Sequence, residues 1–181
     1  MLLFLWESVK NFNTFGTFLP SSFFAARELT SRVNFDTARV IVEFGGGSGS
    51  ITKEILKRMR SDARLVSFES NTSLADVLRE IPDDRLIVVH GMAQDFLVEL
   101  TRRKIERIDS IVSTLPLSLF SPEERKKILE DIHDVLEPGS VYAQMQYSFI
   151  LREEVKRVFP KMRISFNPLN VPPAFFYICE R

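Results

Sequence analysis

Apolar residues from position 39 onward alternate between two patterns. Short runs rich in β-branched and aromatic residues are typical of buried strands. They lie at residues 39–44, 64–70, 85–91, 108–114, 140–148, 163–167 and 173–179. Segments with the spacing of an amphipathic helix lie at residues 50–60, 72–80, 94–105, 122–136 and 150–159. Several strand runs are apolar without interruption, as in parallel strands that helices cover on both faces.

Strands that alternate with helices predict an α/β fold, a doubly wound and mostly parallel sheet of seven strands. The last two runs are joined by the segment PLNVPP, which is too short for a parallel crossover, so we expect an antiparallel last strand. This Rossmann-like domain is expected to span residues 39–181. Residues 1–38 are rich in aromatic side chains and poor in charge, and we expect them to form an N-terminal helical extension.

The amino-acid composition limits which binding partners and which cellular compartment we expect for the protein. The chain has 24 Lys and Arg against 24 Asp and Glu, and this zero net charge weakly disfavours nucleic acid as the main partner. The single cysteine, Cys179, excludes an internal disulfide and fits a reducing compartment. No segment approaches the ~20 apolar residues that span a bilayer. The N-terminal run MLLFLW is too short for a signal peptide. We therefore expect a cytoplasmic protein.

Four glycines fall within residues 45–49, between the first strand and the first helix of the domain. Ligands of open α/β sheets bind at the carboxyl ends of the strands. Gly45, Gly47 and Gly49 permit positive φ and allow the backbone to approach a ligand without a Cβ in the way. Glu69 closes the second strand, where a carboxylate can accept both hydroxyls of a ribose. The pattern predicts a ligand site between Glu43 and Glu69; the alternative is a tight turn beside a surface glutamate.

Four successive segments resemble motifs of the Rossmann-type methyltransferases that use S-adenosylmethionine. They are VEFGGGSGSIT, VSFESN, VVHGMAQDF and DSIVSTLPLSLF. Within that superfamily the chain most resembles the bacterial phospholipid N-methyltransferases, which convert phosphatidylethanolamine toward phosphatidylcholine and are related to ribosomal RNA adenine dimethylases. The resemblance extends to TFGTFLPSSFFAARELT, LEPGSVYAQMQYSF and NVPPAFFYICER. It implies S-adenosylmethionine as the cofactor and S-adenosylhomocysteine as its product.

The resemblance also implies how the first strand and its glycine turn contact the cofactor. Glu43 would receive the methionine amino group, directly or through water. The backbone of Phe44, Gly45, Gly47 and Gly49 would pass beneath the methionine and the ribose.

The next two motifs would hold the nucleoside. The resemblance assigns Glu69 to the ribose hydroxyls and Ser70 to the border of the adenine. Met92 and Ala93 occupy the place where the family commonly has Asp-Ala, whose acid contacts the adenine amino group. Methionine accepts that hydrogen bond poorly but can pack against the ring face. Plain core packing is the alternative for Met92.

The fourth motif distinguishes between methyl acceptors. Ser113, Leu115, Pro116 and Leu117 resemble the Ser-Gly-Leu-Pro-Leu loop of the phospholipid enzymes, with Thr114 in place of the glycine. This implies that Ser113 borders the cofactor, that Ser113 and Leu115 are catalytic, and that carbonyls beside Pro116 face the methyl group. Adenine N-methyltransferases instead carry Asn or Asp and a stacking aromatic residue here. The loop therefore disfavours RNA; an ordinary turn after the strand is the alternative.

An amine acceptor must lose a proton before it attacks the methyl group. Tyr147, just past the fifth strand, is our candidate to contact a lipid headgroup, through its hydroxyl or through cation–π attraction to the growing methylammonium. The alternative is an interior tyrosine whose hydroxyl is already satisfied. We do not expect His90 or His133 to be the catalytic base, and we expect no metal site.

The first residues form one apolar face on a helical wheel. This face comprises Leu2, Leu5, Trp6, Val9 and Phe12. Such a helix could lie in a membrane interface, pack into the core or form a dimer contact. A basic cluster could aid membrane attachment or be a solvated helix end. It comprises Arg102, Arg103, Lys104 and Arg107.

Together these features predict an S-adenosylmethionine-dependent N-methyltransferase that acts on the amine of a phospholipid headgroup. We expect a phospholipid or membrane surface as its partner, at the inner face of the membrane, and not nucleic acid. Two rivals remain: an RNA or small-molecule methyltransferase, and a cofactor-binding or membrane-associated protein without catalytic activity.

Overall fold

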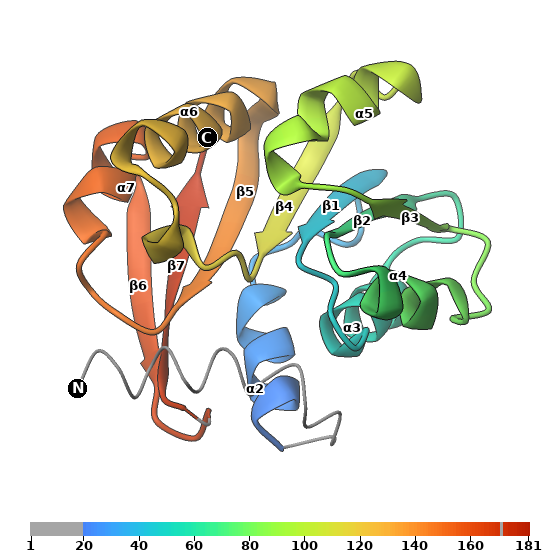
Figure 1. Ribbon diagram of the computed structural model, residues 1–181, viewed down its shortest axis with the longest axis horizontal. Helices are drawn as coiled ribbons and strands as arrows, with labels where there is room; N and C mark the ends of the chain where they lie inside the picture. Colours follow the sequence, from blue (N-terminus) through green and yellow to red (C-terminus); the bar gives the residue numbers. More distant parts are fainter. Residues whose placement is uncertain (1–19, 171) are drawn as a thin grey trace.

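The computed structural model of the protein describes residues 20–170 and 172–181 (Figure 1). Within them, seven strands form one sheet in the order β3-β2-β1-β4-β5-β7-β6. The strands are β1 (Val40–Phe44), β2 (Arg64–Glu69), β3 (Leu86–His90), β4 (Ile108–Ser113), β5 (Leu136–Gln146), β6 (Met162–Asn167) and β7 (Ala174–Glu180). Strands β1 to β5 pair in parallel, whereas β7 is antiparallel to both β5 and β6. The predicted doubly wound, mostly parallel sheet with an antiparallel last strand is confirmed.

Helices cover both faces of the sheet. They are α2 (Pro20–Leu29), α3 (Ser50–Arg58), α4 (Thr72–Arg79), α5 (Phe96–Arg102), α6 (Pro122–Val135) and α7 (Arg152–Val158), with short 3-10 turns η1 (Ala93–Asp95) and η2 (Leu117–Leu119). Figure 1 shows α5, α6 and α7 grouped at the top and α2, α3 and α4 at the bottom. Val42 and Phe44 join the core with α5 to α7, while Ile41 joins the core with α2 and α3. This division follows from the two-residue period of a strand.

The boundaries of β5 and α5 differ from those that the sequence predicts. β5 begins at Leu136, before the predicted residue 140. Ile108 pairs with Leu136 and Ser110 with Val141, so β5 bulges between these pairs. Gly139 has a φ of +84° in this bulge, which is typical of such an irregularity. The helix predicted at 94–105 is divided into η1 and α5.

Helix α2 and residues 30–38 are the described part of the predicted N-terminal extension. Its residues Ala25, Ala26 and Leu29 are buried in the core with α3. The amphipathic stretch predicted near the start of the chain lies outside the described residues. Of the helices that the structure describes, none is long and apolar enough to cross a membrane.

Candidate active site

The glycine turn joins β1 to α3 at the carboxyl edge of the sheet. Gly45, Gly47 and Gly49 have φ values of +79°, +53° and +82°, the positive values that the spacing predicts. A Cβ on Gly45 would lie 2.6 Å from Thr114 Oγ1, and one on Gly46 would lie 2.4 Å from Ser67 Oγ. A Cβ on Gly47 would meet nothing nearer than the Gly45 carbonyl oxygen at 4.0 Å. The backbone of Gly47 therefore faces open space. Gly45 and Gly46, in contrast, must be glycines because a Cβ at either position would clash with a packed side chain.

Helix α3 starts directly from this turn. Its N-cap residue is Gly49, and no side chain caps the first turn. The N–H groups at the start of a helix point outward and attract negative charge. A carboxylate of a ligand above Gly47 would therefore be stabilised at this helix end.

Glu43 lies beneath the glycine turn and is 1% exposed. Its Oε2 accepts hydrogen bonds from Ser67 Oγ at 2.6 Å and Thr52 Oγ1 at 2.7 Å. Its Oε1 is buried and has no hydrogen-bond partner among the described residues. Burial raises the pKa of Glu43, and the nearby Glu69 raises it further, although the two hydrogen bonds oppose this. A buried acceptor without a donor is costly, and a ligand ammonium would satisfy it.

Glu69 lies on the other side of the same turn. Its Oε2 accepts from the Gly47 N–H at 2.9 Å, and its Oε1 accepts from the Asn71 N–H at 2.8 Å. Each carboxylate oxygen has a further lone pair. The side chain is 8% exposed and is held by backbone on both oxygens, so it is already oriented to accept hydroxyl groups of a ribose.

The adenine side is formed after β3. Ala93 is buried, and Met92 is 48% exposed, so Met92 is not a core residue. Sequence analysis missed Gln94, whose Oε1 is buried with no hydrogen-bond partner in the described part of the chain. An amide carries both a donor and an acceptor, as does the amino edge of adenine. Gln94 could therefore supply the hydrogen-bonding group that Met92 lacks.

Ser70 and His90 close the same side of the site. His90 Nε2 lies 3.2 Å from the Ser70 carbonyl oxygen and 3.3 Å from Thr72 Oγ1. The ring thus bridges β3 to the turn that starts α4. This contact gives His90 a structural role at the border where the adenine is predicted.

The loop after β4 is tied to the glycine turn. The Thr114 N–H donates to the Phe44 carbonyl at 3.0 Å, and Thr114 Oγ1 donates to the Gly45 carbonyl at 3.0 Å. Ser113 is fully buried, and its Oγ accepts from the Leu115 N–H at 3.2 Å. Ser113 therefore shapes the loop from inside, and Thr114 couples that loop to the turn.

Two glutamines of β5 hold the Leu115 carbonyl. Gln144 Nε2 donates to it at 2.9 Å and Gln146 Nε2 at 3.1 Å. Tyr142 donates to Gln144 Oε1 at 2.6 Å. The Leu115 carbonyl therefore already accepts two hydrogen bonds from within the chain, and the expectation that the carbonyls beside Pro116 face the methyl group stays a prediction. The structure adds Gln144 and Gln146 as residues that position this loop.

Tyr147 follows β5 at the same edge of the sheet. It is half-buried against the core that contains α2 and α3. Burial raises the pKa of its hydroxyl, so the phenol is neutral near pH 7. The hydroxyl makes no hydrogen bond to any described residue, which leaves it able to contact an acceptor.

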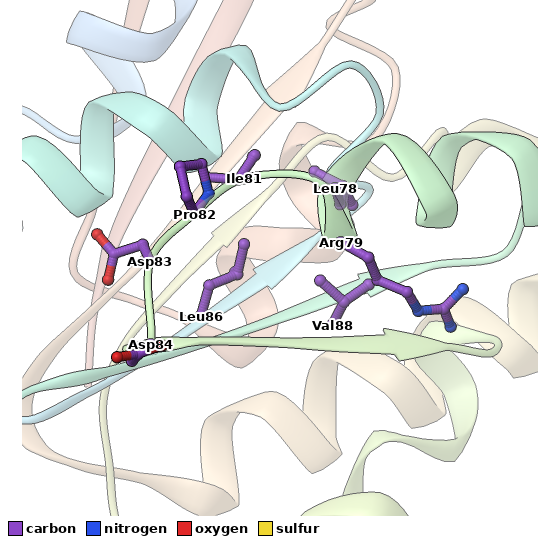
Figure 2. Close-up of a pocket in the computed structure, with 8 residues that line it drawn as sticks. All are labelled: Leu78, Arg79, Ile81, Pro82, Asp83, Asp84, Leu86 and Val88. Atoms are coloured by element: carbon purple, nitrogen blue, oxygen red, sulfur yellow. The ribbon is translucent and has the colours of Figure 1, made fainter.

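A surface hollow of about 500 Å³ lies between the end of α4 and β3 (Figure 2). Leu78, Ile81 and Leu86 form its apolar lining. Two of its charged groups are already paired, since Asp83 binds Arg85 and Arg79 binds Asp76. The hollow contains none of the predicted site residues. In the described part of the chain, no group of His, Cys, Asp or Glu side chains is arranged to hold a metal ion.

The fold and the site define a class I S-adenosylmethionine-dependent methyltransferase. A family model described as a methyltransferase domain matches residues 41–139, so the chain belongs to the methyltransferase domain family. An ornithine lipid N-methyltransferase from Singulisphaera acidiphila is 32% identical and covers 98% of this chain and 94% of its own length. The ribosomal RNA small subunit methyltransferase H of Aromatoleum aromaticum is 33% identical over 46% of this chain and 26% of its own length. The solved O-methyltransferase of Bacillus cereus, in complex with S-adenosylhomocysteine, superposes with a TM-score of 0.69 at 17% identity, covering 97% and 90% of the two chains.

The residues of this chain fit the cofactor. Glu43 offers an unsatisfied acceptor to the methionine ammonium, and the Gly47 backbone leaves room beside it. Glu69 would hold the ribose hydroxyls, and Gln94 the adenine amino edge. These assignments are expectations that ligand binding can test.

Replacing Gln94 by Leu is expected to weaken the binding of S-adenosylhomocysteine by about ten-fold, because a buried hydrogen bond left unmade costs about 1–2 kcal/mol. Titration calorimetry measures this change. Met92→Leu in the same turn is the matched control and should bind as the wild type does. Equal affinity of Gln94→Leu and the wild type would show that Gln94 does not contact the adenine.

Proposed function

We propose that this methyltransferase transfers the methyl group to the amine of an amphiphilic lipid. The observation that carries the proposal is the similarity to an ornithine lipid N-methyltransferase over 98% of the chain. The similarity to the ribosomal RNA enzyme covers 46% of the chain, which is less than the matched methyltransferase domain of residues 41–139. A similarity over 98% of the chain includes the acceptor side of the molecule as well as the cofactor side.

The acceptor loop supports a lipid rather than a nucleobase. Leu117 is fully buried, so it does not present a ring or an apolar face on which a base could stack. The Thr114 hydroxyl is already bonded to the glycine turn. A flipped adenine is usually held by an aromatic side chain and a polar group that grips its amino nitrogen. Neither of these residues provides such a contact.

The basic cluster also gives little support to RNA. Arg102 and Arg103 pair with Glu99, and Arg107 pairs with Asp109. These residues precede β4, whereas the acceptor loop follows it. The cluster therefore lies at the edge of the sheet opposite the site, and much of its charge is neutralised. For the same reason it is unsuited to hold a membrane against the acceptor loop.

When bound, S-adenosylmethionine supplies a methyl group already activated by its sulfonium. The chain itself must bind the cofactor and the acceptor, orient them toward each other and exclude water from the site. Glu43 would fix the methionine end of the cofactor and Glu69 its ribose, and the hydrogen bonds to Leu115 would keep the acceptor loop in one conformation. Orientation of this kind accounts for a large part of the acceleration of a bimolecular reaction.

Tyr147 would contact the acceptor amine. Its neutral phenol can accept a hydrogen bond from the amine, and its ring can stabilise the growing methylammonium by about 0.5–2 kcal/mol. The described segments 113–121 and 144–151 hold no carboxylate or histidine. In this proposal the amine proton leaves to water, helped by desolvation that lowers the amine pKa.

Two lipid amines match this chemistry. The resemblance in sequence motifs favours phosphatidylethanolamine, and the curated relative acts on ornithine lipid. Both are amphiphiles that carry an amine, so the proposed contact with Tyr147 applies to either.

Methyl transfer from radiolabelled S-adenosylmethionine tests the proposal. The purified full chain is incubated in parallel with phosphatidylethanolamine vesicles, ornithine lipid vesicles, phosphatidylcholine vesicles and ribosomal RNA. We expect label on one or both amine lipids and none on phosphatidylcholine, which has no free amine. Label on RNA alone would replace the proposal by an RNA methyltransferase, and Glu43→Gln measures the background.

A further inference from the structure

Charged residues are unevenly distributed between the two edges of the sheet. The segments that enter the strands are rich in charge; they are residues 36–39, 60–64, 82–85, 102–107 and 160–163. The segments at the carboxyl edge on the acceptor side contain no Asp, Glu, Lys or Arg; they are residues 113–121, 146–151 and 167–174. In a chain with 27% charged residues, such loops would ordinarily carry several charges. This edge of the molecule is therefore suited to a partner of low polarity.

Large apolar side chains are exposed along these segments and at the end of β6. They are Leu119 (58%), Phe149 (46%), Ile150 (79%), Phe166 (53%) and Leu169 (62%), and together they are called the apolar rim. Only three other large apolar side chains in the described residues are comparably exposed, namely Val77, Met92 and Val98. Exposed apolar side chains gathered in one place mark interaction sites, whereas scattered ones do not.

Aromatic contacts fix the positions of the loops that form the apolar rim. Phe149 packs edge-on against Phe175 with ring centroids 4.5 Å apart, and Phe166 lies 4.9 Å from the same ring. Tyr177 donates a hydrogen bond to the Ser148 carbonyl at 3.0 Å, which anchors the loop after β5. The loop after β5 and the β6–β7 hairpin are thus fixed to one another, and little ordering is needed before they bind.

The rim begins where the acceptor site ends. Tyr147 lies two residues before Phe149 on the same loop. Leu119 follows the acceptor loop that Gln146 clamps. A lipid whose amine reaches Tyr147 must direct its hydrocarbon chains away from the cofactor, and the rim is the apolar surface next to that point.

We propose that the apolar rim docks on the surface of a lipid bilayer and inserts Ile150 and Leu169 among the lipids, so that the acceptor amine reaches Tyr147 without leaving the membrane. The proposal rests on the proposed lipid acceptor. Because the rim has no charge, it binds zwitterionic bilayers through apolar burial, which salt screens little. The experiment distinguishes a bilayer from two other partners that could cover the rim, namely a second copy of the chain and residues 1–19.

Partition of the full chain onto vesicles of phosphatidylcholine and phosphatidylethanolamine tests the docking. The variant I150S/L169S removes the two most exposed rim side chains and is expected to bind the vesicles about ten-fold more weakly. The matched control V77S/V98S replaces two exposed apolar residues on α4 and α5 and should bind as the wild type does. Raising the salt to about 1 M should leave wild-type binding nearly unchanged.

Two further measurements distinguish the possible causes of weaker vesicle binding by I150S/L169S. Calorimetry with S-adenosylhomocysteine should give equal affinity for I150S/L169S and the wild type, which shows that the fold and the cofactor site are intact. Methylation of a short-chain, monomeric phosphatidylethanolamine should fall much less in I150S/L169S than methylation in vesicles, which should fall with vesicle binding.

Equal vesicle binding by I150S/L169S and the wild type would overturn the proposal. A wild-type dimer that the variant disrupts would instead assign the rim to a second copy. Loss of vesicle binding on deletion of residues 1–19 but not in the rim variant would assign the docking to those residues. Label on RNA alone in the acceptor assay would remove the proposed function, while vesicle partition would still report on the rim.

Discussion

Replacing Glu43 by Gln is expected to stabilise the cofactor-free protein and to weaken binding of S-adenosylhomocysteine by a hundred-fold or more. The wild-type carboxylate is 1% exposed and has one oxygen without a partner among the described residues. A neutral amide removes the cost of burying that charge, which we expect to raise the free energy of unfolding by about 1–3 kcal/mol. The ligand ammonium then loses its counter-charge, which costs about 3–5 kcal/mol.

The pH dependence of stability gives this substitution a second test. Burial raises the folded-state pKa of Glu43 above its ordinary value of 4.5, so the folded protein holds that proton more tightly than the unfolded chain does. This contribution to stability is complete below about pH 4.5 and is lost as the pH rises through the folded-state pKa. The advantage of Glu43→Gln over the wild type should therefore grow as the pH rises through that interval.

Urea unfolding across pH and titration calorimetry measure the two effects. Glu123→Gln, on the exposed surface of α6, is the control and should change neither quantity. Unaltered cofactor affinity in Glu43→Gln would show that the orphaned oxygen does not meet the methionine ammonium.

Replacing Gly45 by Ala is expected to lower the free energy of unfolding by about 2–4 kcal/mol. Two causes add together. Gly45 has a φ of +79°, which strains any residue with a Cβ, and that Cβ would lie 2.6 Å from Thr114 Oγ1. Because Thr114 also bonds to the Gly45 carbonyl, the added atom separates the acceptor loop from the cofactor turn.

Gly139→Ala separates the two causes. Gly139 has a φ of +84°, but no atom lies within 4 Å of the position its Cβ would take. Its substitution should therefore cost only the backbone strain, about 1–2 kcal/mol. Thr114→Ala should recover part of the loss in Gly45→Ala and none of the loss in Gly139→Ala. Strictly additive losses in the pair Gly45→Ala and Thr114→Ala, measured by urea unfolding, would contradict the contact.

Local signals in the sequence were sufficient to predict the fold and the cofactor side of the candidate site. The strand runs, the glycine turn and the short PLNVPP connection each depend on neighbouring residues, and the structure confirms the sheet that they predict. Glu43 and Glu69 end adjacent parallel strands, so their proximity follows from topology alone.

The acceptor side depends on contacts between distant segments. Gln144 and Gln146 alternate in an apolar strand, but no local pattern reveals that both bond to the Leu115 carbonyl about 30 residues earlier. Gln94 could not be predicted from the sequence, because the family motif places the adenine contact at Met92 and the Gln94 amide oxygen becomes a buried, unsatisfied acceptor only when η1 is folded.

Titration of the wild-type protein with S-adenosylhomocysteine tests most directly whether the turn between Glu43 and Glu69 is a cofactor site. One molecule should bind per chain with measurable heat, and S-adenosylmethionine should compete for the same site. Absence of binding by either molecule to the folded protein would contradict the account.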